Sequence, residues 1–360
     1  MSKKRIVLVI PYLHAGGMER VMSELANQFI NYTNTEIHLV LYGKKSDVFY
    51  KISESVIFHK PLFSFERNNR IISTIKTIYF LRKTLKEIKA DSILSFGEIW
   101  NNMVLLSVFG LKLPVFVSDR CQPNKSLGRV HDLLRKKLYP GAKGIIAQTE
   151  TAKQVYLNYF THPNIKVVGN PIKATILGEN VKREKIVLSV GRLIKTKNYD
   201  LLIKSFIKIR IAGWSLIIVG DDAIKQQNKI QLQSLINDNN ATDYIVLEGK
   251  KKNVEKYYLK SSIFAFTSSS EGFPNVIGEA LSSGLPVVAY DCIAGPSDII
   301  QDGINGFLIP LFDQNVFEQK LKKLMEDHDL RELMSKNAPE TVKKFSTVDV
   351  ASDFFSFITK

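Results

Sequence analysis

The chain is poor in cysteine and has no long apolar stretch. Only two cysteines, Cys121 and Cys292, occur among 360 residues, and they are far apart in the sequence. This excludes a disulfide framework and a Cys-rich zinc site, and it suits a reducing compartment. The longest apolar stretch beyond the N-terminus, residues 103–111, is much shorter than the roughly 20 residues that span a bilayer.

A signal peptide is also not expected. The basic N-terminus leads into the apolar run Ile6 to Ile10, which ends at Pro11 without a small-residue cleavage site. This run predicts a buried first strand instead. We therefore expect a cytoplasmic protein, or one attached peripherally to the cytoplasmic face of the inner membrane.

Acidic residues are scarce in the first half of the chain. Residues 1–170 contain 25 Lys and Arg against 12 Asp and Glu, whereas residues 171–360 contain 25 against 23. This asymmetry indicates an anionic partner for the first half, such as nucleic acid, anionic lipid or a phosphorylated substrate. Nucleic acid is the least expected of these, because no recognition motif accompanies the charge.

Short apolar runs alternate with longer amphipathic runs along the whole chain. Strands buried on both faces and alternating with helices predict an α/β architecture with parallel sheets. Helices are expected over segments such as 17–30, 70–88, 200–211 and 275–283. The expected strands are residues 5–12, 36–42, 92–96, 115–118, 144–148 and 165–168, and then 186–190, 215–219, 244–248, 263–267 and 286–290.

The strand series restarts after Asn170 and Pro171, and the polar stretch 170–183 predicts a linker. We predict two doubly wound lobes, an N-terminal one over residues 1–170 and a C-terminal one over residues 171–345. A last helix within about residues 346–360 carries three phenylalanines and could pack on either lobe.

Ligands of open α/β sheets bind beyond the carboxyl ends of the strands. After the first strand, Gly16 and Gly17 allow close backbone approach and lead into a helix N-terminus that favours phosphate. The segment is neither a GxGxxG fingerprint nor a Walker loop, so a plain tight turn is an alternative. After the strand at 186–190, Arg192 and Lys197 could neutralise a diphosphate, or could be ordinary surface charges.

The segment 268–280 is the strongest local feature. Glu271 is expected in the loop after a strand, and Glu279 on the helix that begins near Pro274. The N–H groups near Asn275 and Val276 would point at an anion. Either carboxylate could accept hydrogen bonds from the diol of a ribose or hexose.

Seven residues separate Glu271 from Glu279, and this spacing resembles the E-x7-E signature of family 4 glycosyltransferases, which have the GT-B fold. The likeness is greatest to bacterial O-antigen, capsule and lipid-linked oligosaccharide transferases. Further segments resemble family motifs, in the same order, along nearly the whole chain. Residues 16–20 resemble the N-terminal glycine loop, residues 189–192 with 197–198 resemble the diphosphate-binding loop, and residues 302–308 resemble a late turn of the second lobe.

This resemblance implies two Rossmann-like lobes with a central cleft, and a retaining, metal-independent transfer from a nucleotide-diphosphate sugar. Arg192 and Lys197 would hold the diphosphate, Glu279 the ribose, and Glu271 the transferred sugar. No cofactor is implied beyond the donor substrate, since cations and a helix terminus hold the leaving group. Other donor-binding positions implied by the resemblance are Gly16, Gly17, Asn275 and Val276, with residues 248–253 near the nucleobase.

Two segments depart from the family pattern. Many members carry a histidine where this chain has Asp119, in a segment similar to the Ser-Glu-Arg variant of polysaccharide transferases. Asp119 is therefore a candidate catalytic residue or a group that positions a substrate hydroxyl. The pair Asp221-Asp222 replaces Asp-Gly and is not the spaced Asp-x-Asp of metal-dependent transferases, so no metal site is expected.

The same likeness implies a UDP-sugar donor, namely UDP-GalNAc, UDP-GlcNAc or UDP-Gal, and a lipid-linked acceptor of the undecaprenyl-pyrophosphate type. A sugar-nucleotide 2-epimerase of the same fold and a non-catalytic nucleotide-sugar-binding protein are the alternatives. Two basic clusters in the first lobe could contact an anionic membrane, or could be a solvated face: residues 66–89 with their interleaved isoleucines, and Arg129, Arg135, Lys136 and Lys137.

Overall fold

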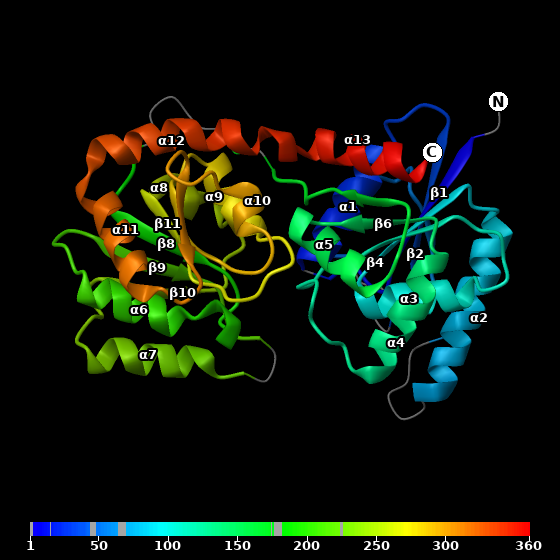
Figure 1. Ribbon diagram of the computed structural model, residues 1–360, viewed down its shortest axis with the longest axis horizontal. Coiled ribbons are helices and arrows are strands. Elements are labelled where there is room, and N and C mark those ends of the chain that lie inside the picture. The colour runs from blue at the N-terminus through cyan, green and yellow to red at the C-terminus, as the bar shows by residue number, and fades with distance from the viewer. Residues whose placement is uncertain are drawn as a thin grey trace. The chain divides into compact units, whose positions relative to one another are not determined.

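The computed structural model describes residues 3–14, 16–43, 48–63, 70–173, 175, 182–223 and 226–360. The chain divides into two compact units, of which unit 1 comprises residues 1–171 with 347–360 and unit 2 comprises residues 172–346 (Figure 1). Each unit is built on a parallel sheet of its own. Both units are Rossmann-like, as the sequence predicted.

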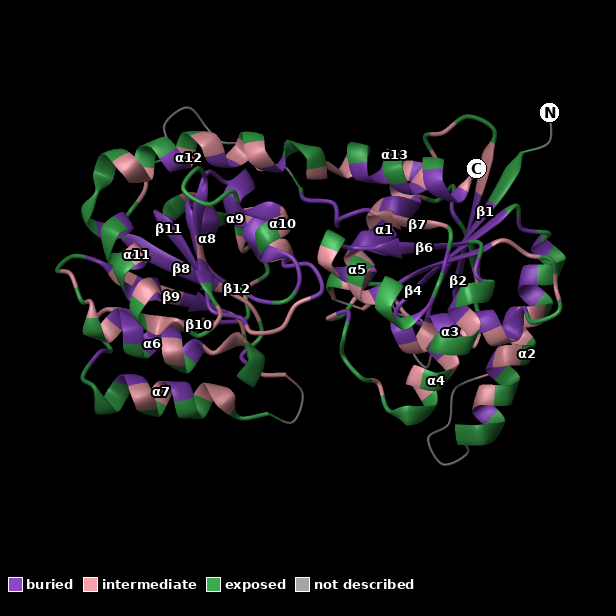
Figure 2. Ribbon diagram, viewed as in Figure 1, coloured by how far each residue is buried: buried purple, intermediate pink, exposed green. Residues whose placement is uncertain are grey.

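Unit 1 contains a seven-stranded sheet in the order β3-β2-β1-β4-β5-β6-β7. All neighbouring strands are parallel, and the inner ones are buried along nearly their whole length (Figure 2). The strands are β1 (Lys4–Ile10), β2 (Thr35–Leu41), β3 (Ile57–His59), β4 (Ser92–Phe96), β5 (Val115–Ser118), β6 (Gly144–Ala147) and β7 (Ile165–Val167).

Helices cover both faces of this sheet. On one face, Leu81 of α2, Val104 of α3 and Tyr156 of α5 join a common apolar core with Val7 and Val117 of the strands. Helix α4 packs beside α3 on this side, whereas α1 and α13 pack on each other (Figure 1). The helices of unit 1 are α1 (Gly17–Phe29), α2 (Arg70–Ile88), α3 (Glu98–Ser107), α4 (Arg129–Leu138), α5 (Glu150–Tyr159) and α13 (Thr347–Ile358).

The C-terminal helix α13 belongs to unit 1 through its aromatic side chains. The rings of Phe355 and Tyr32 stack with centroids 3.9 Å apart, and Phe354 lies 6.0 Å from Phe96. Phe354 is fully buried. The helix therefore completes the core of the first unit although it is the last element of the chain.

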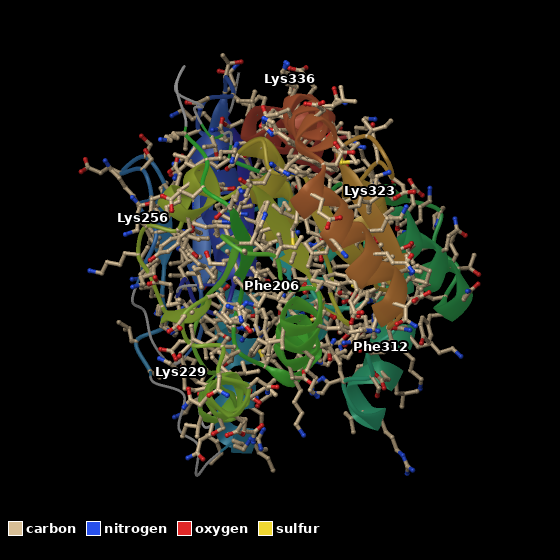
Figure 3. All side chains as sticks on the ribbon, turned by 90° about the vertical axis from the view of Figure 1, so that its left-hand side faces the viewer. Phe206, Lys229, Lys256, Phe312, Lys323 and Lys336 are labelled. Carbon is tan, nitrogen blue, oxygen red and sulfur yellow. The ribbon has the colours of Figure 1, made fainter. Side chains whose placement is uncertain are left out.

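Unit 2 contains a six-stranded parallel sheet in the order β10-β9-β8-β11-β12-β13. One face packs against α6, α7 and α11, and the other against α8, α9, α10 and part of α12. Figure 3 shows Phe206 of α6 inside the unit and Lys323 and Lys336 on the outside of α11 and α12. The strands are β8 (Ile186–Val190), β9 (Ser215–Val219), β10 (Ile245–Gly249), β11 (Ile263–Phe266), β12 (Val287–Asp291) and β13 (Gly306–Pro310).

The helices of unit 2 follow the strands in regular alternation. They are α6 (Tyr199–Lys208), α7 (Asn228–Asp238), α8 (Glu255–Lys260), α9 (Asn275–Ser282), α10 (Pro296–Ile299), α11 (Gln314–Glu326) and α12 (His328–Val342), with the 3₁₀ turns η3 (Lys195–Lys197) and η4 (Lys343–Phe345). Among the helices described, none is both long and apolar enough to cross a bilayer.

Strand order reverses once in each sheet, and these places locate the loops of interest. In unit 2 the reversal lies between the neighbours β8 and β11, where Val187 pairs with Ile263. In unit 1 it lies between β1 and β4. Loops that leave the carboxyl ends of two such strands diverge to opposite faces and leave a crevice in which ligands bind.

Candidate active site

The loops after β8 and β11 flank the reversal point of unit 2, and they carry Arg192, Lys197 and Glu271. Each of these residues therefore lies where an α/β sheet binds its ligand. The sequence placed each of them after its strand, and the sheet topology brings the two loops together.

The loop after β8 begins at Gly191, where a side chain could not be accommodated. A Cβ atom added there would lie 2.8 Å from the Tyr199 hydroxyl and 3.3 Å from Cε of Lys197. The loop then turns through η3, and Asn198 adopts a left-handed conformation, φ 49°, before α6 begins. Arg192 is exposed at the start of this loop, and no salt bridge holds it within the described residues.

Hydrogen bonds fasten the two loops to each other. The backbone N–H of Ser269 donates to the carbonyl of Thr196 at 2.8 Å, and the Thr267 hydroxyl donates to the carbonyl of Lys197 at 2.8 Å. The Asn198 amide in turn donates to the carbonyl of Thr267 at 2.8 Å. The backbone that carries Lys197 is thus fixed relative to the loop that carries Glu271.

Lys197 and Glu271 contact each other directly. The Lys197 ammonium Nζ lies 2.5 Å from Glu271 Oε1, and each side chain is 16% exposed. The ammonium also lies 5.2 Å from the centroid of the Phe266 ring. The sequence predicted both residues at the site but not this ion pair, because 74 positions separate them.

Glu279 lies in α9, which begins at Asn275 after Pro274. Its carboxylate Oε2 accepts a hydrogen bond from the Tyr258 hydroxyl at 3.0 Å, which orients the side chain from α8. Pro274 contributes no side-chain hydrogen bond to the start of α9. The Asn275 N–H donates to the Phe273 carbonyl at 3.0 Å, so it already has a partner within the protein. Val276 follows it in the first turn of α9.

Near the expected nucleobase position, Glu248 has two partners. The Tyr257 hydroxyl donates to Glu248 Oε2 at 2.9 Å, and Lys251 Nζ lies 2.7 Å from the same oxygen. The hydrogen bond from Lys251 lowers the pKa of the Glu248 carboxyl. This carboxylate is therefore ionised at neutral pH and already bound within the protein.

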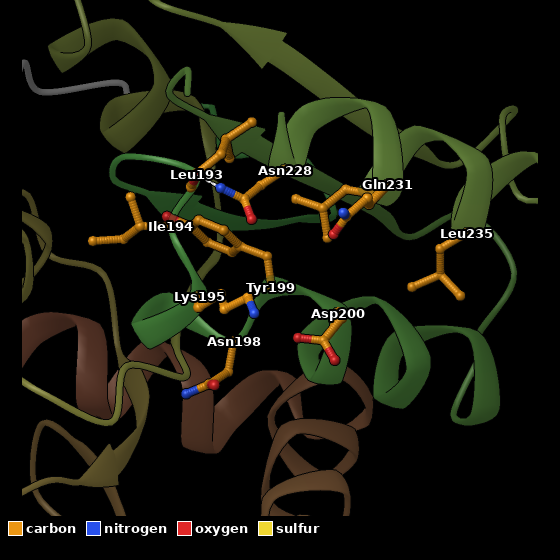
Figure 4. Close-up of a pocket in the computed structure, with 10 residues that line it drawn as sticks. Leu193, Ile194, Lys195, Asn198, Tyr199, Asp200, Asn228, Gln231 and Leu235 are labelled. Carbon is orange, nitrogen blue, oxygen red and sulfur yellow. Dashed lines mark hydrogen bonds between the residues drawn. The ribbon is translucent and has the colours of Figure 1, made fainter. Parts of the chain in front are cut away.

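One pocket near these loops is not lined by the predicted residues. A pocket of about 360 Å³ lies between the start of α6 and α7 (Figure 4). Its lining includes Leu193, Tyr199, Asn228 and Leu235, and excludes Arg192, Lys197, Glu271 and Glu279. We place the candidate site at the reversal point of the sheet instead, because Lys197 and Glu271 meet there.

The pair Asp221-Asp222 follows β9 and serves local structure. The Asp222 carboxylate accepts a hydrogen bond from the Lys229 N–H at 3.2 Å, in the first turn of α7. Asp221 Oδ1 lies 3.9 Å from Lys229 Nζ. In the part of the chain that the structure describes, no cluster of three or more His, Cys, Asp or Glu residues could hold a metal ion.

In unit 1, the glycine loop follows β1 at the reversal point. Tyr50 fixes Gly16 from both sides, because its hydroxyl donates to the Gly16 carbonyl at 2.8 Å and accepts from the Gly16 N–H at 3.1 Å. A Cβ atom at Gly16 would collide with the Glu19 carboxylate. Gly17 is the first residue of α1. Ala15, between the strand and these glycines, lies outside the described residues.

Asp119, at the end of β5, is fully buried and bound within unit 1. Arg135 of α4 lies 2.5 Å from its Oδ2, and the Tyr139 hydroxyl donates to its Oδ1 at 2.5 Å. The Asn101 amide donates to the same Oδ1 at 3.1 Å. Burial raises the pKa of the Asp119 carboxyl to about 6, against the lowering effect of Arg135.

These contacts correct two expectations. The Asp119 side chain has no exposed surface, so in this structure it cannot offer an oxygen to a substrate hydroxyl. Arg135 was expected in a basic membrane-facing cluster, but it is 7% exposed and neutralises Asp119. No sequence signal pointed to this network, whose members are Asn101 of α3, Asp119 directly after β5, Arg135 of α4 and Tyr139 directly after α4.

The segment after Asp119 is held by a second carboxylate. Glu98 Oε1 of α3 accepts hydrogen bonds from the backbone N–H groups of Arg120 at 2.8 Å and Cys121 at 2.6 Å. The Arg120 guanidinium stacks over the Phe96 ring at 3.6 Å and donates to the Asn170 side chain at 2.6 Å. This loop is therefore rigidly placed at the carboxyl end of the sheet.

The remaining basic surface of unit 1 is partly apolar. On the first half of α2, Ile71 is 77% exposed, with Ile72, Ile75 and Tyr79 also exposed, whereas the polar Ser73 is only 4% exposed. Exposed cations accompany these side chains on α2 and α4, namely Arg70, Lys76, Lys83, Lys86, Arg129, Lys136 and Lys137. Glu66 and Arg67 of the expected cluster lie outside the described residues.

Comparison with known proteins finds glycosyltransferases that resemble this chain over nearly its whole length. Residues 176–341 match the family model Glycosyl transferases group 1. A Campylobacter jejuni N-acetylgalactosamine-N,N'-diacetylbacillosaminyl-diphospho-undecaprenol 4-alpha-N-acetylgalactosaminyltransferase is 28% identical, over 99% of each chain. A second C. jejuni relative is a GalNAc-alpha-(1->4)-GalNAc-alpha-(1->3)-diNAcBac-PP-undecaprenol alpha-1,4-N-acetyl-D-galactosaminyltransferase, 25% identical over 99% of this chain and 98% of its own.

The fold is also that of a solved structure. The lipopolysaccharide outer core galactosyltransferase WaaB, in its apo form, superposes with a TM-score of 0.79 at 21% identity, over 99% of each chain. At this identity the likeness establishes the fold alone.

Proposed function

We propose that this chain, which has the GT-B fold, is a glycosyltransferase that transfers a hexose or N-acetylhexosamine from a UDP-sugar to a lipid-linked oligosaccharide, in keeping with its relatives. The single observation that carries this proposal is the convergence of Arg192, Lys197 and Glu271 on the two loops at the reversal point of unit 2. Cations and a carboxylate at one crevice suit a ligand that joins a diphosphate to a polyol.

In the proposed site, Arg192 and Lys197 hold the diphosphate and stabilise its charge as it leaves. The N-terminus of α9, with Val276 in its first turn, adds to this field. Glu279, oriented by Tyr258, accepts the ribose hydroxyls. These groups supply the positive charge that a metal ion would otherwise supply, so we propose metal-independent transfer.

The other groups act on the transferred sugar and on the acceptor side. Glu271 accepts hydroxyl hydrogen bonds from the transferred sugar. Within unit 1, Tyr50 fixes the backbone of Gly16 beyond the end of β1, and the loop of Gly16 and Gly17 contributes to donor binding. Asp119 then acts as a positioning residue, since its contacts fix α4 and the loop beside it.

The names of the relatives support an N-acetylhexosamine as the transferred sugar and an α linkage in the product. Both C. jejuni proteins are named as transferases that build an α-linked N-acetylgalactosamine on an undecaprenyl diphosphate glycan. A UDP-sugar such as UDP-GalNAc carries its sugar in the α configuration, so an α product means retention. We propose the same outcome here, with UDP-GalNAc, UDP-GlcNAc or UDP-Gal as donor.

A thermal-shift screen of UDP-, GDP- and ADP-sugars tests the donor class. UDP-sugars should raise the melting temperature, because a ligand that binds only the folded state stabilises it. Selective stabilisation by GDP-mannose would refute the UDP assignment. Epimerisation of UDP-GlcNAc without acceptor would favour an epimerase, and UDP binding without any transfer would favour a binding protein.

We further propose that unit 1 rests on the anionic inner membrane through α2 and α4. The exposed isoleucines of α2 are suited to the interface, and each nearby cation contributes about 1 kcal/mol at an anionic surface. Flotation with anionic and neutral vesicles checks this. Replacing Lys136 and Lys137 by Glu should weaken binding to anionic vesicles, whereas the same change at Lys323 and Lys336 of unit 2 should not. Equal binding of wild type to both vesicle types would contradict the proposal.

A further inference from the structure

The two residues proposed to hold different parts of the donor hold each other here. Lys197 Nζ and Glu271 Oε1 are 2.5 Å apart, and neither side chain is more than 16% exposed. Because hydrogen bonds join the two loops through Thr196, Thr267 and Asn198, this is a fixed pair rather than a chance approach of mobile surface chains.

Among the residues that the structure describes, neither member of the pair has another charged partner. In the described parts of the chain, no other salt bridge includes Lys197 or Glu271. The ammonium also lies 5.2 Å from the centroid of the Phe266 ring, which carries no charge and cannot neutralise it. A phosphate that binds Lys197 therefore breaks its ion pair with Glu271. The partly buried Glu271 carboxylate then needs new hydrogen-bond donors.

The intact UDP-sugar and the product UDP differ in the hydrogen-bond donors that they offer to Glu271. The intact UDP-sugar brings a diphosphate for Lys197 and sugar hydroxyls for Glu271, so both side chains find new partners. Free UDP brings only the diphosphate, with an additional negative charge on its terminal phosphate. Glu271 then lies beside that charge without donors, and this arrangement is unfavourable for two partly buried anions.

We propose that Glu271 discriminates the donor from the product UDP by exchanging its bond with Lys197 for bonds with the transferred sugar. In the structure, the ion pair neutralises both groups. When the donor binds, Lys197 and Glu271 exchange their ion pair for bonds with the diphosphate and with the sugar hydroxyls. When UDP binds, Glu271 loses Lys197 and gains no hydrogen-bond donor. After transfer, Glu271 competes for Lys197 and so favours UDP release. This inference rests on the proposed function, because it takes the same ligand at the same two residues.

Calorimetric titration of UDP and UDP-GalNAc into Glu271→Gln tests the exchange. UDP should bind more tightly than to wild type, by roughly five- to tenfold, the size of one partly buried charge interaction. UDP-GalNAc should bind more weakly, because an amide accepts sugar hydroxyls less well than a carboxylate. The ratio of the two dissociation constants therefore changes in a direction that a general loss of structure would not produce.

Glu318→Gln is the matched control. Glu318 is similarly buried and lies 2.6 Å from Lys208 on the outer helices of the same unit, so its loss changes the net charge equally. Its UDP affinity should equal that of wild type. Glu271→Ala provides a second variant without the amide, and it too should tighten UDP binding.

The outcomes separate the inference from the proposed function. Wild type that binds no UDP would contradict the function itself. Wild type that binds UDP, with unchanged or weakened UDP affinity in both Glu271 variants, would overturn the exchange and leave the function intact.

Discussion

Replacing Lys197 by Ala should weaken UDP binding strongly, whereas the same change at Lys195 should not. Both lysines belong to the turn η3, but only Lys197 points to the other loop, where its ammonium meets Glu271 at 2.5 Å. Lys195 lies instead beside the pocket between α6 and α7 (Figure 4). The two variants therefore remove the same charge from the same turn at two different places.

The magnitude follows from the contact that is lost. One hydrogen bond between a charged donor and a phosphate contributes about 1.5–3 kcal/mol, which corresponds to a roughly 10- to 150-fold higher dissociation constant. Lys197→Ala also leaves Glu271 unneutralised beside the diphosphate, so the loss should lie in the upper part of this range. Lys195→Ala should change the constant less than about twofold, as expected for an exposed charge.

Calorimetric titration of UDP into wild type and both variants provides the comparison, and denaturant unfolding shows whether each variant is folded. An unchanged dissociation constant for folded Lys197→Ala would refute the placement of the diphosphate. Equal losses in the two variants would show that the turn attracts anions only through its overall charge.

Two further predictions concern the cores of the two units. Phe354→Ala should lower the free energy of unfolding by about 3–5 kcal/mol, the range for a fully buried phenylalanine, whereas Val348→Ala, at an exposed position of the same helix, should change it little; equal midpoints in urea would show that α13 does not contribute to the core. Burial raises the pKa of the Cys292 thiol to about 12, so in a Cys121→Ser background Ellman's reagent at pH 8 should label Cys292 only after unfolding. Rapid labelling of the folded variant would contradict its burial.

Much of the fold could be read from the sequence because the central strands are buried on both faces. Such strands are continuous apolar runs, and β4, β5, β8 and β9 begin and end where the pattern predicted. The pattern missed β3, a short edge strand with two exposed residues, and β13, whose Gly306 start was interpreted as part of a turn.

For the candidate site, the sequence predicted the positions of residues along the chain but not the contacts between their side chains. The sequence placed Arg192, Lys197 and Glu271 in loops after strands, because loop position depends only on the preceding strand. It could not predict which side chains meet, since the contact of Lys197 with Glu271 depends on β8 and β11 being neighbours.

Asp119 shows the limit most clearly. Its partners Asn101, Arg135 and Tyr139 lie 16 to 20 positions away on elements that only tertiary packing brings together. From the sequence, a lone aspartate after a strand therefore looks available to bind a ligand. Only the structure shows that other side chains of the protein already bind its carboxylate. The same packing removed Arg135 from the basic surface to which its neighbours Lys136 and Lys137 belong.

The central claim is transfer of a sugar from a UDP donor to a lipid-linked glycan with retention. The most direct measurement incubates the enzyme with an undecaprenyl-diphosphate-linked oligosaccharide and UDP-GalNAc, UDP-GlcNAc, UDP-Gal or GDP-mannose in turn, and analyses the lipid product by mass spectrometry and NMR. We expect the mass of one added sugar with a UDP donor, and an α anomeric signal for the new linkage. A β linkage, transfer from GDP-mannose alone, or an unchanged acceptor with every donor would contradict the account.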